Sequence, residues 1–78
     1  MKLRNLGSNK TEIRFENGGV VFFSYNTPVA AQLPSGTFIK TSTKWSRTTS
    51  KHINQWLGRA RAEEVDQKVL DNFSNTGV

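Results

Sequence analysis

The sequence contains no cysteine and only one histidine among its 78 residues. Without cysteine, the chain can form neither a disulfide nor a zinc site built from thiolates. One histidine supplies too few imidazole ligands for a transition-metal site made by the protein alone. We therefore expect no metal and no cofactor. The lack of cysteine also fits the reducing conditions of a cytoplasm.

Long apolar runs are missing as well. No segment approaches the ~20 apolar residues that cross a bilayer as a helix. The first residues, MKLRNLGSNK, lack the apolar centre of a signal peptide. We expect a single soluble domain, residues 1–78, that works in the cytoplasm without a membrane partner. A chain of this size forms a thin core, which is also compatible with a homodimer.

Acidic residues are absent from one long segment. Residues 41–61 hold five cations and no acid, whereas residues 62–78 hold one cation and four acids. The whole chain carries a formal net charge of +5. Positive charge that is segregated in this way favours an anionic partner.

The first forty residues alternate between short apolar segments and turns. TEIRF alternates polar and apolar residues as a half-buried strand does, and VVFFSY is apolar on both faces, which indicates a covered strand. Between them, ENGG contains the Asn-Gly pair of tight hairpins. NTP and PSG mark two further turns. The pattern predicts an antiparallel β-meander of four to five short strands over about residues 2–41.

The apolar period changes after Trp45. Ile53, Trp56 and Leu57 lie at i, i+3 and i+4, which predicts an amphipathic helix near residues 49–57 packed on one face of the sheet. Thr48 or Thr49 is the expected N-cap, and Gly58 is placed to end the helix.

A short final helix is predicted near residues 66–73, with Asp66 as its cap and Val69, Leu70 and Phe73 directed inward. The fold class is therefore α+β. The expected core consists of Ile13, Phe15, Phe23, Leu33, Ile39, Ile53, Trp56 and Leu57.

Catalysis finds little support in these residues. His52 is the obvious acid–base candidate, but its i±4 neighbours, Thr48 and Trp56, could not orient it as a carboxylate would. A nucleophilic serine or threonine served by His52 would also need a third group, and no spacing indicates one. We interpret His52 as a boundary residue packed on Trp56, and expect that the protein is not an enzyme.

A cluster of acids, Glu63, Glu64 and Asp66, could bind a divalent cation. Acids in this arrangement are more typical of the solvated start of a helix. We adopt that interpretation.

The basic segment offers a more specific site. Lys44 and Arg47 stand just before the predicted helix, where backbone amides are free and the partial charge is positive. Lys51 points away from Ile53, and hydroxyl side chains surround the helix start. Such groups make most backbone contacts to DNA. The candidate binding residues are Lys44, Trp45, Arg47, Thr48, Lys51, Arg59 and Arg61. The alternative is that the hydroxyls only cap the helix and the cations only solvate it.

The two tryptophans have different expected roles. Trp56 falls in the apolar stripe and is assigned to the core. Trp45 could stack on a base beside the cations, as in proteins that bind single strands, or plug the gap between sheet and helix. We favour the plug, because a domain of this size is short of apolar mass.

The segments FSYNTPVAA and FIKTSTKWSRTTSKHINQWL resemble a family of small bacteriophage-encoded accessory proteins of unknown function. The resemblance spans most of residues 5–73. Its pattern is YxTPVA followed by WSxTTSxHIN, which here begin at Tyr25 and Trp45. It implies a phage protein working in a bacterial host cytoplasm and implies no activity. This chain is more basic at Arg59 and Arg61 than the pattern requires.

Two functional hypotheses follow. In the first, the protein is a non-catalytic module that binds nucleic acid, DNA or RNA, through the basic loop and helix N-terminus. In the second, it binds and occludes a host defence or metabolic protein, or a phage protein, through an exposed aromatic patch or a strand edge.

Overall fold

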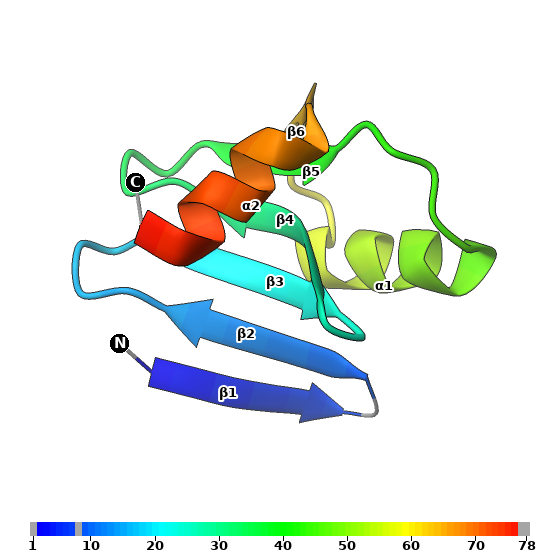
Figure 1. The fold of residues 1–78 in the computed structure, drawn as a ribbon, viewed down its shortest axis with the longest axis horizontal. Coiled ribbons are helices and arrows are strands. Elements are labelled where there is room, and N and C mark those ends of the chain that lie inside the picture. The colour runs from blue at the N-terminus through cyan, green and yellow to red at the C-terminus, as the bar shows by residue number, and fades with distance from the viewer. Residues whose placement is uncertain (1, 8, 77–78) are drawn as a thin grey trace.

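The computed structural model describes residues 2–7 and 9–76 (Figure 1). The elements follow in the order β1 (Lys2–Gly7), β2 (Lys10–Arg14), β3 (Val20–Ser24), β4 (Thr27–Gln32), β5 (Phe38–Thr41), α1 (Arg47–Leu57), β6 (Ala62–Val65) and α2 (Gln67–Thr76). The α+β class is confirmed. The helix predicted at 49–57 begins at Arg47, and the one predicted at 66–73 runs to Thr76.

All six strands form one sheet in the order β1-β2-β3-β4-β5-β6. The first five pair antiparallel with their neighbours, which confirms the predicted meander. β6 pairs parallel to β5, with Phe38 opposite Ala62 and Thr41 opposite Val65. A parallel neighbour needs a crossover connection. Helix α1 forms the crossover and positions the segment that carries the basic residues.

The sixth strand was not predicted. β6 holds Glu63 and Glu64, which we assigned to the solvated start of a helix, and both are exposed in the structure. Charged side chains are common on edge strands, and four residues are too few to show a clear period. Alternate residues of a strand point to opposite faces, so β6 separates these two carboxylates rather than bringing them together.

The two helices cover opposite faces of the sheet. On β3, Val21 packs in a cluster with Leu70 and Phe73 of α2, while the next residue, Phe22, packs with Ile53 of α1. Alternation along the strand therefore supplies both cores. Figure 1 shows α2 lying across the front of the sheet, and α1 extending to the right. The doubly apolar sequence of β3 is explained by a cover on each side.

The predicted core is largely confirmed. Ile39 and Ile53 are buried, and the other members are partly buried: Ile13, Phe15, Phe23, Leu33, Trp56 and Leu57. Val69 was expected to point inward, and this was wrong, because it is 45% exposed. It precedes Leu70 by about 100° around the helix, which places it beside the buried stripe. No helix among residues 2–7 and 9–76 is long and apolar enough to cross a membrane.

Candidate functional site

The start of α1 is fixed by Ser46. This residue has an extended backbone (φ −86°, ψ 167°), and its hydroxyl accepts a hydrogen bond from the Thr49 amide at 3.2 Å. Ser46 is therefore the N-cap, and the assignment to Thr48 or Thr49 was wrong. Thr49 is buried instead, and its hydroxyl accepts hydrogen bonds from Ser24 on β3 and from Ser46. At the other end, Gly58 closes the helix at φ +60° as predicted.

A broad depression of about 740 Å³ lies against this helix start. We call it the basic depression. Its lining consists of Lys44, Trp45, Ser46, Arg47, Ser50, Lys51, Asn54 and Gln55. No acid is among these residues, and none lies in the first turn of α1. The structure thus brings three predicted cations and one predicted aromatic residue onto a single surface beside the positive end of a helix.

Trp45 does not plug the gap between sheet and helix. Its side chain is 47% exposed, and its indole Nε1 donates a hydrogen bond to Gln67 Oε1 of α2 at 3.3 Å. The plug interpretation was wrong because other side chains occupy the interface: Ile53, Trp56 and Leu57 of α1 pack there with Phe22. The connection from β5 to α1 carries Trp45 outside that interface, beside the cations.

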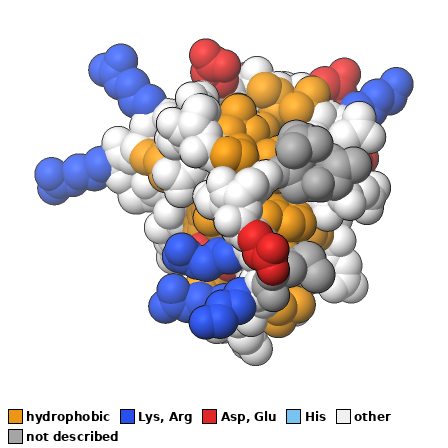
Figure 2. Space-filling model, turned by 90° about the vertical axis from the view of Figure 1, so that its left-hand side faces the viewer, with side chains coloured by type: hydrophobic (Ala, Val, Ile, Leu, Met, Phe, Trp, Pro, Cys, Tyr) orange, Lys and Arg blue, Asp and Glu red, His pale blue; other side chains and the backbone are white. Residues whose placement is uncertain are grey.

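Three predicted site residues do not line the basic depression. Thr48 is exposed but is not among the lining residues, and Arg59 and Arg61 follow the C-terminal end of α1. Eleven helical residues separate the two ends of α1 by about 16 Å. Figure 2 shows the molecule from the end opposite the helix start, where some basic side chains project singly and others gather beside an acidic one. The basic depression combines three predicted site cations with an exposed tryptophan.

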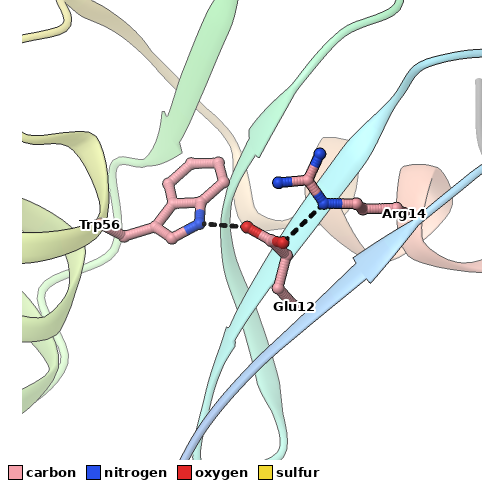
Figure 3. A network of polar contacts seen from close by, with 3 residues as sticks. All are labelled: Glu12, Arg14 and Trp56. Carbon is pink, nitrogen blue, oxygen red and sulfur yellow. Dashed lines mark hydrogen bonds and ion pairs between the residues drawn. The ribbon is translucent and has the colours of Figure 1, made fainter. Parts of the chain in front are cut away.

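Trp56 ties α1 to the sheet through a buried acid (Figure 3). Its ring stacks on Phe22 with centroids 5.3 Å apart, and its Nε1 donates to Glu12 Oε1 at 3.0 Å. The second carboxylate oxygen of Glu12 accepts from Arg14 Nε at 2.9 Å. Glu12 is only 5% exposed. Strand alternation assigned Glu12 to the polar face of β2, but no local pattern of residues indicates that α1 covers that face.

His52 has different neighbours from those expected. Its Nδ1 lies 2.9 Å from the Ser24 hydroxyl, and its ring centroid lies 6.1 Å from that of Tyr25. The aromatic contact of His52 is thus with Tyr25, and the expectation that it stacks on Trp56 was wrong. Ser24 is buried under α1. The hydrogen bond with this hydroxyl orients the imidazole.

A second depression, of about 330 Å³, adjoins the first at Gln55. Its floor includes Arg4 and Lys10 from the first hairpin, and its wall includes His52 and Trp56 from α1. Sequence reasoning missed these two cations as neighbours of α1. The pairing register of β1 with β2 would have indicated their position. Arg4 pairs with Glu12, and Lys10 is two residues from Glu12 on the same face.

The fold and this surface together define a small α+β domain that presents an exposed basic face on a crossover helix. The chain belongs to a family of unknown function (DUF8033), whose family model matches residues 1–72. No curated protein and no solved structure matches the chain.

Proposed function

We propose that the protein is a non-catalytic module that binds nucleic acid through the basic depression. One observation carries the proposal: Lys44, Arg47 and Lys51 line a single acid-free surface together with the exposed ring of Trp45. Lysine, arginine and hydroxyl side chains at a helix N-terminus are the groups that hold phosphate oxygens. A nucleic-acid backbone supplies several phosphates in a row, which matches a surface with several cations.

Binding suits this surface better than catalysis. The ionisable groups that line the basic depression are lysines and one arginine, which hold an anion through charge and N–H donors. The histidine nearby is hydrogen-bonded to a serine that is itself buried. General acid–base chemistry needs a group that titrates near the working pH and reaches the substrate.

The proposed setting comes from the sequence resemblance described above. We propose a bacteriophage accessory protein that acts in the cytoplasm of a bacterial host. A small basic module of this kind would act by covering nucleic acid, and a homodimer would double the number of cations available to one strand.

Filter binding at several salt concentrations tests the proposal with matched variants. Arg47→Ala and Lys51→Ala remove cations from the basic depression. Arg61→Ala and Lys68→Ala remove the same charges beyond the end of α1 and on α2, which covers the other face of the sheet. We expect the first pair to weaken binding several-fold and to flatten the log–log salt slope by about one unit each, because one phosphate contact is lost.

The control variants should bind like the wild type. Lys10→Ala is a poor control, because Lys10 lines the neighbouring depression. If all four variants lose affinity equally, net charge rather than this surface governs binding. If the wild type binds neither DNA nor RNA near physiological salt, the proposal is wrong.

A second candidate function is capture of a host or phage protein at the β1 edge. β1 has one neighbour in the sheet, and Leu3 on this strand is 70% exposed. Leu3 also lines a hollow of about 260 Å³ with Ile13, Phe23 and Tyr25. An open strand edge beside apolar side chains is suited to strand addition. A partner recovered from nuclease-treated host lysate by the wild type but not by Leu3→Lys would favour this function.

A further inference from the structure

Two exposed aromatic rings line one hollow beside the basic depression. Trp45 is 47% exposed and Tyr25 is 48% exposed. The hollow measures about 180 Å³, and the rest of its lining is Ser24, Thr27, Val29, Ser46 and Thr49. Tyrosine and tryptophan are enriched at interfaces, where one end of the side chain is apolar and the other is wet. Their position in a shared hollow marks them as a place where a flat ligand could stack.

The backbone holds Tyr25 in an unusual conformation. Tyr25 stands in the two-residue turn between β3 and β4, which is flanked by the pair of Ser24 and Thr27, and its φ is +59°. An aromatic residue rarely adopts a positive φ, and glycine would adopt it without strain. The Tyr25 amide donates to the Asn9 carbonyl at 2.7 Å. The turn therefore carries an aromatic side chain at a position whose backbone conformation favours glycine.

The Tyr25 ring is also supported from the side. Its centroid lies 6.1 Å from that of His52, at a tilt of 38°. His52 is in turn oriented by its hydrogen bond with the buried Ser24. A ring that is held in place before binding loses little side-chain entropy when a partner stacks on it.

The hollow adjoins the basic depression, because Trp45 and Ser46 line both. Rings and phosphate-binding cations therefore lie on one surface. We propose that this surface binds single-stranded nucleic acid, with bases stacked on Tyr25 and Trp45 and the phosphates held by Lys44, Arg47 and Lys51. This inference rests on the proposed function and specifies its ligand. In a duplex, neighbouring base pairs cover the faces of the bases, so only an unpaired strand offers them to a side chain.

Tyr25→Gly separates this role from a structural one. Glycine relaxes the positive φ, so the variant should melt at or above the temperature of the wild type. Its affinity for oligo(dT) and oligo(U) should fall by about fivefold or more, because one stacked base is lost. Tyr25→Phe keeps an aromatic face and should bind more tightly than Tyr25→Gly. Trp45→Ala should lose affinity to a similar extent.

The salt dependence distinguishes stacking from charge. Tyr25→Gly and Trp45→Ala should keep the wild-type log–log slope, whereas Arg47→Ala should flatten it by about one unit. A blunt duplex of equal length should bind more weakly than the single strand. Comparison of oligo(dU) with oligo(U), which differ only in the 2′-hydroxyl, identifies which sugar is preferred.

Each outcome bears on one proposal or on both. If Arg47→Ala weakens binding while Tyr25→Gly and Trp45→Ala bind like the wild type, the stacking inference is wrong and the proposed function stands. The same holds if the duplex binds as tightly as the single strand. If no oligonucleotide binds the wild type, both are overturned.

Discussion

Glu12 lies beneath α1 with a donor on each carboxylate oxygen, Trp56 on one and Arg14 on the other. Burying a carboxylate is costly unless it is hydrogen-bonded, and here the bonds also connect a helix to a strand. Stacking of Trp56 on Phe22 adds apolar contact at the same point. Trp56 therefore contributes to stability through both its ring and its N–H group.

At the residue scale, the two tryptophans allow a comparison between a ring packed against the sheet and an exposed ring. We expect Trp56→Ala to lower the free energy of unfolding by about 3–5 kcal/mol, because it leaves a cavity and deprives the buried Glu12 of a donor. A loss of that size would leave little of the stability typical of a small domain. Trp45→Ala, at an exposed position, should change stability by less than about 1 kcal/mol. Urea denaturation followed by circular dichroism measures both, and equal effects would contradict the assigned roles.

The residue that caps α1 belongs to both the fold and the basic depression. Ser46 caps the helix through its hydroxyl and lines the depression. Its two roles can be separated, because aspartate is as good an N-cap as serine but carries a negative charge.

At the element scale, we expect Ser46→Ala to cost about 1 kcal/mol of stability, because the Thr49 amide loses its acceptor. Ser46→Asp should preserve the cap and the melting temperature, yet weaken nucleic-acid binding several-fold by placing an anion among the three cations. Thermal melts and filter binding on the same preparations test both effects. Undiminished binding by Ser46→Asp would argue against phosphate contact at this surface.

The elements that sequence reasoning found are those with a local signal. The hairpin after β2 follows from Asn17-Gly18, and α1 follows from the spacing of Ile53, Trp56 and Leu57. β6 was missed for two reasons. Its pairing partner, β5, is separated from it in sequence by the whole crossover, and its two glutamates are more typical of a helix than of a strand.

The candidate site could be predicted in part for a related reason. Arg47 and Lys51 were expected near the helix start, and both line the basic depression, because one helix determines their relation. The exposure of Trp45 and the burial of Glu12 depend on which face each helix covers. Contacts between distant segments decide that, and a single sequence does not reveal them. The turn position of Tyr25 could not be predicted from its residue type, because tyrosine rarely adopts a positive φ.

At the scale of the whole molecule, helix α2 packs against the hairpin formed by β2 and β3. Phe73 of α2 is buried and packs edge-on against Phe15, with centroids 5.8 Å apart. Its ring also lies so close to Gly19 that a Cβ there would come within 2.8 Å of Phe73 Cζ. The absence of a side chain at Gly19 is what allows this approach.

We therefore expect Gly19→Ala to destabilise the fold by about 1–3 kcal/mol, because the buried ring must move. Adding Phe73→Leu, which shortens the opposing side chain, should make the Gly19→Ala change less costly than it is in the wild type. A double-mutant cycle by urea denaturation measures this coupling. Additive effects of the two changes would show that the close approach has no energetic weight.

The parallel pairing of β6 with β5 also bears on the order in which the molecule assembles. Strands β1 to β5 pair with their neighbours in sequence. In contrast, the pairing of Phe38 with Ala62 joins strands that are separated by the whole of α1. Loop closure of that length is slow compared with hairpin formation, so α1 should be fixed in place late in folding. In native-state hydrogen exchange, amides of β6 and α1 should then open together at a lower free energy than those of β3. If nucleic acid binds the basic depression as proposed, it should raise the free energy of this opening and of global unfolding, because both release the ligand.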